Sequence, residues 1–264
     1  MLALEFAFPA GRYHANPWGR NVNEGEVEWP PAPYRLARGL IDIQKRRFPD
    51  WSQARLESIL EAISGRPHYI LPQANTAHIR AYMNSNEKDA SKKQLIFDSF
   101  VALDREQKLW MAFSNEPDEQ TRADLAALLQ EMNYLGRSES WVSVRLNGSV
   151  PSEDWDCLPV ESISDPMRYE NEKLACVLPK EQYLDMGFNE KVAWLDALCM
   201  STKDLLRQGW SSPPTLTWVD YARKADKLNL IRPSRTRYQP KREYRCFKYA
   251  VHSKVRPTVQ ATIL

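Results

Sequence analysis

The order of hydrophobic periodicities over residues 1–146 constrains the fold more than any other feature of this sequence. Apolar residues alternate with period two where a strand is expected and recur every three or four residues where a helix is expected. The expected elements are a strand over 2–8, a helix opened by Pro33, a second helix between Asp50 and Gly65, strands over 68–72, 94–103 and 108–114, a helix over 119–132 and a strand over 140–146. Because strands and helices do not alternate regularly, the order disfavours a doubly wound sheet and favours an α+β, ferredoxin-like arrangement.

The remaining segments give weaker signals. Residues 9–33 read as a long loop, and residues 73–93 read as polar and weakly structured. Residues 148–178 have no clear pattern, residues 180–208 are expected to be helical with a break near Gly187, and short strands are expected from Thr215 onward. We therefore predict a core over 1–147 and a second mixed α/β region over 148–264.

The charge distribution is strongly uneven. Residues 223–256 contain twelve Lys or Arg and only two acidic residues, which gives that segment a charge of +10 in a chain whose formal net charge is +2. Tyr238, Tyr244, Phe247 and Tyr249 are interleaved with these cations. A solvated basic face is the simpler explanation, but cations with aromatic faces are typical of single-stranded nucleic-acid binding. The candidate RNA-binding residues of this segment are Arg232, Arg235, Arg237, Lys241, Arg242 and Arg245.

Several classes of protein are disfavoured by what the sequence lacks. The four Cys form no CxxC pair and the four His have no metal-ligand spacing, so neither a metal site nor a disulfide framework is expected. There is no Gly-rich phosphate loop and no nucleophile elbow, and no cofactor is expected. No apolar run approaches the length of a membrane span, and the N-terminal residues lack the basic start of a signal peptide, so a cytoplasmic location is expected.

Three segments contain candidate RNA contacts. In the first, GRYHANPWGR (11–20), arginines suit phosphates and aromatic rings suit bases, although Tyr13 and Trp18 could equally cover the core. In the third, YLGRSESWVSVRL (134–146), Gly136 permits a tight turn that could equally be an ordinary turn into a core strand. The candidates in these two segments are Arg12, Tyr13, His14, Trp18 and Arg20, and then Arg137, Ser138, Ser140 and Trp141.

The second segment is NTAHIRAYM (75–83). Read as a helix, it places His78 and Tyr82 on one side and Arg80 on another. Its pattern fits either a finger that touches nucleic acid or a merely solvated loop. A third alternative, ranked last, is metal-independent RNA cleavage, with His78, Tyr82, Tyr69 and His14 as the candidate general acids and bases.

Taken together, four segments resemble the CRISPR-associated "Cas-five" subunits of the RAMP superfamily, in their type I-G (formerly I-U) branch. The matching segments are GRYHANPWGR, WPPAPYRLARGLI (29–41), YILPQANTAHIRAYM and LGRSESWV. In that branch the subunit is commonly the N-terminal half of a fusion with a "Cas-six" endonuclease. The resemblance implies a RAMP-type, RRM-like ferredoxin core with an inserted thumb near residues 73–93 and further β-rich elaboration.

The resemblance also implies a function. The chain would cap the 5′ handle of the crRNA in a Cascade-like effector and contact a Cas-seven-like backbone subunit and a Cas-eight-like large subunit. A Cas-six endonuclease, fused or separate, is a further possible partner, and target DNA would be contacted only indirectly. The handle would lie near Arg12, His14, Arg20, Arg35, Arg38, Arg137 and Ser138, with His78, Arg80 and Tyr82 in the thumb.

Two departures from the family pattern bear on catalysis. Ala77 and Ala81 stand where relatives carry a glycine and a second histidine, and the sequence ends at Leu264, about where a fused endonuclease would begin. We therefore expect a non-catalytic RNA-binding subunit. A metal-independent crRNA-processing endoribonuclease and a general basic RNA-binding module outside CRISPR systems are the alternatives.

Overall fold

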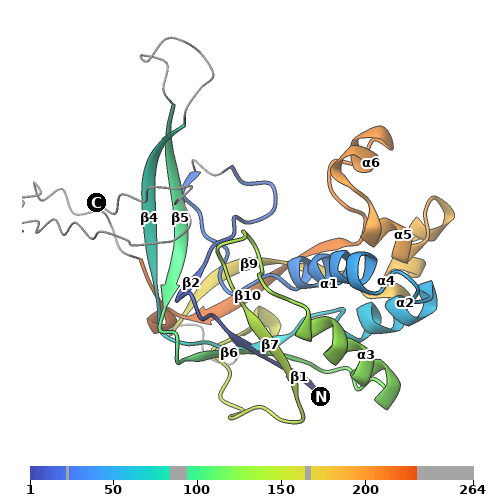
Figure 1. Cartoon of the computed structure of the whole chain (residues 1–264), viewed down its shortest axis with the longest axis horizontal. Helices are drawn as coiled ribbons and strands as arrows, with labels where there is room; N and C mark the ends of the chain where they lie inside the picture. The colour runs from blue at the N-terminus through green and yellow to red at the C-terminus, as the bar shows by residue number, and fades with distance from the viewer. Residues whose placement is uncertain (22–23, 84–93, 164–167, 231–264) are drawn as a thin grey trace, which may run out of the picture. The chain divides into compact units, whose positions relative to one another are not determined.

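The computed structural model describes residues 1–21, 24–83, 94–163 and 168–230 (Figure 1). Over these residues the fold is mixed α+β, with two sheets whose strand pairs are antiparallel except for one. The first sheet has seven strands in the order β7-β1-β6-β3-β8-β10-β9. Its strands are β1 (Leu2–Ala7), β3 (His68–Ile70), β6 (Lys108–Phe113), β7 (Ser143–Asn147), β8 (Cys157–Pro159), β9 (Tyr169–Val177) and β10 (Leu216–Lys224).

The second sheet has the order β11-β4-β5-β2, and its β11–β4 pair is parallel. Its strands are β2 (Arg12–Tyr13), β4 (Ala74–Met83), β5 (Gln94–Leu103) and β11 (Leu228–Asn229). The hairpin of β4 and β5 projects from the body of the chain (Figure 1). The expectation of weak structure over 73–93 is therefore wrong for β4. Most of the described side chains of β4 are at least partly exposed, so the strand needs no apolar stripe. Its small and polar residues, such as Thr76 and Ala77, therefore give no periodic signal in the sequence.

The three long helices begin where the sequence predicts. They are α1 (Pro33–Arg47), α2 (Gln53–Ala62) and α3 (Glu119–Gln130). Proline suits the first position of α1 because the missing N–H has no intrahelical partner there. The side chains of Ser52 and Asp118 accept the backbone N–H of the third residue that follows each of them, which caps α2 and α3.

The second half of the chain continues the first sheet. Strand β8 joins β3 through the pair Tyr69↔Cys157, and β10 and β9 follow outward from β8. The described residues on both sides of residue 147, where the sequence suggests a division, lie within one compact unit. The expected helical region contains three short helices, with a left-handed Gly187 between the first two. The short elements here are η3 (Val160–Ser162), α4 (Lys180–Asp185), η5 (Phe188–Glu190), α5 (Trp194–Cys199), α6 (Thr202–Arg207) and η6 (Ala225–Lys227).

One continuous core joins the sheet to its helices. Leu4 and Phe6 of β1, Leu40 of α1, Leu128 of α3 and Tyr221 of β10 are all fully buried in the same cluster. Each such side chain contributes about 1.5–3 kcal/mol by leaving water, which holds the helices against the sheet. No helix in the described part of the chain has both the length and the apolar character needed to cross a membrane.

Candidate nucleic-acid interface

Three segments that are far apart in the sequence meet at His14, which directly follows β2. The ring is buried, with 3% of its surface exposed. Its Nδ1 lies 2.6 Å from Glu139 Oε1, and its Nε2 lies 2.8 Å from Asp98 Oδ1 of β5. Carboxylates accept hydrogen bonds, and a histidine donates from both nitrogens only as imidazolium. The arrangement therefore places the His14 ring between two carboxylates, one within hydrogen-bond distance of each ring nitrogen.

The turn over residues 135–140 is built around the backbone of His14. Gly136 has φ +90°, and a Cβ at this position would lie 2.5 Å from the carbonyl oxygen of His14. That oxygen accepts the N–H of Arg137 at 2.9 Å and the hydroxyl of Ser140 at 3.2 Å. Glycine is required here by both backbone conformation and space.

The side chains of this turn extend the same network. The guanidinium of Arg137 donates to Asp98 Oδ2 at 2.8 Å, so the carboxylate of Asp98 is in hydrogen-bond contact with both Arg137 and His14. Partial burial raises the pKa of Glu139, but its own backbone N–H, the His14 ring and the Arg137 charge outweigh burial and leave the pKa below its ordinary value. The contacts among His14, Asp98, Arg137 and Glu139 thus fix the turn against the middle of β5.

The register of the hairpin separates its two faces. Cross-strand partners share a face and successive residues alternate, so His78 and Arg80 lie with their partners Ser99 and Phe97. The ring of His78 stacks on Phe97 at 4.6 Å between centroids, and the Arg80 guanidinium lies 5.8 Å from the same ring. The helical interpretation, which separated His78 from Arg80, is wrong because the segment is a strand.

The opposite face of the hairpin carries Asp98 and Phe100. Arg12, on the neighbouring strand β2, lies over the Phe100 ring at 4.9 Å, and His14 lies 6.0 Å from that ring. Arg12, His14 and Arg137 therefore gather on one face, while His78 and Arg80 lie on the other. The side chain of Tyr82 is outside the described residues.

Two of the residues predicted to contact RNA instead hold the long loop in place. Arg35 donates to both carboxylate oxygens of Glu28 at 2.8 Å and to the carbonyl of Asn16 at 2.7 Å. The fully buried Tyr13 donates its hydroxyl to the same carboxylate at 2.6 Å. Burial, followed by the Glu28 charge, raises the pKa of Tyr13. Burial lowers the pKa of Arg35, but Glu28 outweighs it and the net shift is upward. Tyr13 is thus a core residue, which is the alternative to an RNA contact that the sequence left open.

The other predicted residues of these segments occupy different positions. Trp18 is 39% exposed and meets Tyr34 edge to face, so it is partly open to solvent. Arg20 is exposed and ion-paired with Glu24 and Glu26, and Arg38 donates to the carbonyl of Leu198. Ser138 is exposed, Ser140 is fully buried, and Trp141 is 61% exposed opposite Tyr134 in an isolated bridge.

The four candidate general acids and bases are not brought together. His14 and His78 lie on opposite faces of the hairpin sheet, because His78 pairs with Ser99 while His14 contacts the neighbouring Asp98. Tyr69 is fully buried in the other sheet and donates to the carbonyl of Pro31 at 3.2 Å. Burial, with the neighbouring Tyr221, raises the pKa of Tyr69. No group of three or more potential metal ligands occurs within the described ranges.

The basic block begins inside the described part of the chain, and there its cations are paired. Arg223 is 1% exposed and donates to Glu170 and Glu172 at 2.8 Å. Lys224 pairs with Asp154 and Asp156, and Lys227 also pairs with Asp156. These three cations are therefore ion-paired with acids of residues 148–178. The six candidates from Arg232 to Arg245 lie outside the described residues.

Sequence reasoning missed the residues that organise this region. Asp98 and Glu139 were not singled out because each is an isolated acid with no motif around it. Phe97 and Phe100 read only as strand residues, since their role depends on cross-strand register. Tyr134 begins the segment over residues 134–146, which we call the LGR-S segment, and it directly precedes the turn over residues 135–140, which we call the LGR-S turn. It was not predicted to contact RNA, although it is 43% exposed.

Comparison with known proteins yields a distant structural likeness. No protein-family model matches the sequence, and no curated protein matches it. Among solved structures, the chain is similar to one described as the crystal structure of a CRISPR protein from Archaeoglobus fulgidus, with a TM-score of 0.41. The two are 16% identical over 90% of this chain and 88% of that chain. This likeness is too distant to assign the chain to a family.

Proposed function

We propose that the chain is a non-catalytic RNA-binding subunit of a type I CRISPR effector that holds the 5′ handle of the crRNA. The observation that carries the proposal is that two motif segments, 11–20 and 134–146, meet at His14 against β5, the strand that pairs with the third motif segment, 75–83. Residues 11–20, the β4–β5 hairpin and the LGR-S turn are tied together there by Asp98, Arg137 and Glu139. Three of the four segments that resemble the Cas-five subunits are therefore held together, two of them by this network and the third by the pairing of β4 with β5.

The strand order supports a ferredoxin-like, RAMP-type core. Strands β7, β1, β6 and β3 are neighbours in that order, and α1 with α2 and then α3 form the two crossovers. This is the pairing expected of a β-α-β-β-α-β unit. The β4–β5 hairpin is inserted between the second and third strands of this unit, where a thumb is expected from the resemblance.

The chemistry of the surface suits a single-stranded polyanion. Arg12 and Arg137 supply cations on one face of the hairpin, and Arg80 supplies one on the other. Exposed Trp141 and Trp18 offer rings on which bases stack. Backbone-subunit and large-subunit partners of the Cas-seven and Cas-eight kinds are part of the proposal.

The test is binding of the purified chain to a labelled repeat RNA in EDTA, with the products run on a denaturing gel. We expect intact RNA and tighter binding of the 5′-handle sequence than of a scrambled sequence of equal length. If the chain alone binds no RNA, the same comparison on the complex assembled with its backbone subunit decides the proposal. Complexes that assemble on crRNA equally well without this chain would overturn it.

The same gel separates the alternative functions. A discrete cleavage product that vanishes in His78→Ala, with Lys203→Ala on the distant helix α6 as the control, would establish the endoribonuclease instead. Equal affinity for handle and scrambled RNA with a steep salt dependence would establish a general RNA-binding module.

A further inference from the structure

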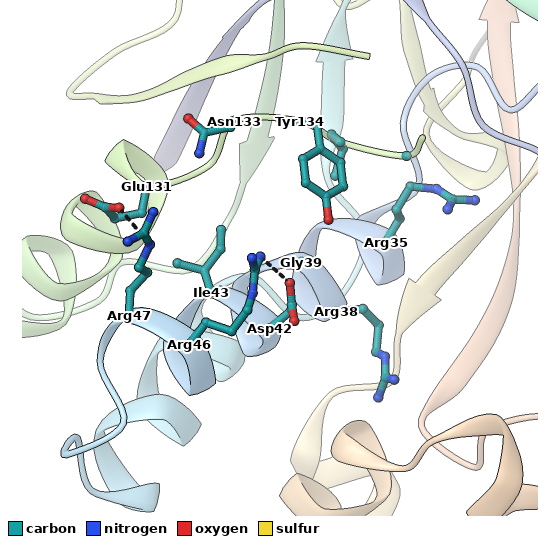
Figure 2. Close-up of a pocket in the computed structure, with 12 residues that line it drawn as sticks. Arg35, Arg38, Gly39, Asp42, Ile43, Arg46, Arg47, Glu131, Asn133 and Tyr134 are labelled. Atoms are coloured by element: carbon teal, nitrogen blue, oxygen red, sulfur yellow. Dashed lines mark hydrogen bonds and ion pairs between the residues drawn. The ribbon is translucent and has the colours of Figure 1, made fainter. Parts of the chain in front are cut away.

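A pocket of about 300 Å³ lies between α1 and the segment that leads into the LGR-S turn (Figure 2). Its volume is at the lower end of the roughly 300–1,000 Å³ typical of small-ligand sites. The lining residues of α1 recur every three or four positions and so share one face of the helix. The pocket is lined by Arg35, Arg38, Gly39, Asp42, Ile43, Arg46, Arg47, Glu131, Asn133, Tyr134, Leu135 and Gly136.

Gly39 is the most informative residue of this lining. It lies in the middle of α1, where glycine is the weakest helix former after proline. Packing does not require it, because an added Cβ would meet nothing nearer than the Met132 Cε, at an ordinary 3.5 Å. Glycine at this position costs the helix stability relative to alanine, and no close contact offsets that cost. Gly39 leaves the helix backbone bare on the wall of the pocket.

The cations of the pocket are available to an anionic ligand. Arg46 is paired with Asp42, and Arg47 lies 3.4 Å from Glu131, but all four side chains are more than 40% exposed. Exposed ion pairs of this kind hold their partners weakly and exchange readily. Arg38 donates to a backbone carbonyl, so its charge is not neutralised by that contact. Arg35 is already paired with Glu28, so the three remaining arginines face the two acids of the lining.

Tyr134 supplies an aromatic surface to the same pocket. Its ring is drawn over α1 with the hydroxyl toward the stretch that carries Gly39 and Asp42 (Figure 2). It is 43% exposed and lies two residues before Gly136, in the segment that anchors the proposed RNA surface. A stacking ring, a bare helix face and flanking guanidinium groups match the parts of one nucleotide, namely a flat base and a phosphate.

We propose that this pocket takes one nucleotide of the bound single-stranded RNA, with the base between Tyr134 and Gly39 and the phosphate on Arg46 and Arg47. The inference rests on the proposed function and adds the site at which a single base is held. A free nucleotide shares this chemistry, so both sources are tested.

The decisive variant is Gly39→Ala. Alanine is a better helix former and fits without a clash, so the thermal midpoint should stay the same or rise. The added methyl group occupies the face that the base needs, so the affinity for labelled repeat RNA should fall at least fivefold. Tyr134→Ala should lose a similar factor, while Tyr134→Phe, which keeps the stacking ring, should lose less than twofold. Asp42→Asn should tighten binding, because it removes a repelling charge and frees Arg46.

A photo-crosslink gives an independent readout. A series of RNAs is made, each with 5-iodouridine at a different position of the handle. Only one of these RNAs should crosslink to the peptide that contains Tyr134. The pocket is overturned, and the proposed function is left standing, if Arg80→Ala weakens RNA binding while three pocket variants bind like the wild type. Those variants are Gly39→Ala, Tyr134→Ala and Asp42→Asn. Competition by free AMP with no crosslink from RNA would also overturn it. Failure of the wild-type chain and of its complex to bind RNA would overturn both.

Discussion

His14 shows how a single buried side chain sets the geometry of the interface. Its ring holds Asp98 on the hairpin and Glu139 on the turn, while its backbone carbonyl holds the N–H of Arg137. A buried charge is tolerated only when it is paired and hydrogen-bonded, and His14 has both carboxylates within 2.8 Å. Removing either acid would therefore affect the hairpin and the turn together.

The pH dependence of stability tests this network through Glu139. Its pKa is lowered in the folded chain, so its stabilising contribution is complete above its ordinary value of 4.5. That contribution is lost as the pH falls through the lowered folded pKa. Glu139→Gln should be less stable than the wild type at pH 7, and the difference should shrink below about pH 4.5. Urea unfolding at several pH values measures it, and a difference that is constant with pH would contradict the assignment.

Substitution of Gly136 should destabilise the fold. Gly136→Ala places a Cβ 2.5 Å from a backbone oxygen that cannot move aside, and does so at φ +90°. We expect a loss of more than about 2 kcal/mol in the free energy of unfolding, above the cost of backbone strain alone.

Two other glycines separate the effect of backbone strain from the effect of the close contact with His14. Gly19→Ala has φ +80° but no neighbour within 4 Å, so it reports strain without a clash, and Gly148→Ala has neither. Urea unfolding should rank the losses Gly136 first, Gly19 second and Gly148 last. Equal losses at Gly136 and Gly19 would show that the close contact with His14 is not limiting.

At the scale of elements, the sequence revealed those that bury an apolar face and hid those that do not. Helices α1, α2 and α3 carry apolar stripes, and Pro33 marks the start of α1, so all three were predicted correctly. Strand β4 was missed because its side chains, such as His78 and Arg80, stay partly or fully exposed. The contacts of the site depend on cross-strand register, which residue spacing along the chain does not encode.

The hairpin makes a prediction of its own about RNA binding. Arg80 is exposed, and its side chain lies near the Phe97 ring, so removing it should leave the fold intact. If Arg80 contacts one phosphate, Arg80→Ala should lower the affinity and reduce the slope of log K against log salt by about 0.7. Lys203→Ala, an exposed cation on α6, is the control and should change neither. An unchanged slope for Arg80→Ala would place the RNA on the other face of the hairpin.

At the scale of the whole molecule, the seven-stranded sheet draws strands from both halves of the chain, so we expect a single cooperative unfolding transition. Strands β8, β10 and β9 extend the sheet of the first half, and the core includes both Leu4 and Tyr221. The sequence suggested a division at residue 147 because no clear periodicity spans residues 148–178. Strand β8 there has three residues, and its place in the sheet depends on pairing with the distant β3 and β10.

Residues 232–264 can then be tested for what they add to RNA binding. They contain nine Lys or Arg and one Glu. A chain truncated after Ile231 should keep its thermal midpoint and its single unfolding transition. It should bind all RNA more weakly, with a salt slope smaller by about 0.7 for each phosphate that the truncated chain no longer binds.

Preference for the handle sequence should survive the truncation, because the hairpin and the LGR-S turn remain. A full-length variant with Arg232, Arg235, Arg237, Lys241, Arg242 and Arg245 changed to Gln separates charge from chain length and should reproduce most of the loss in slope. Affinity for handle and scrambled RNA, measured from low to high salt, decides between the two regions. Loss of handle preference on truncation would move sequence recognition from the His14 surface to the basic segment, since a purely electrostatic contribution does not distinguish the two RNAs.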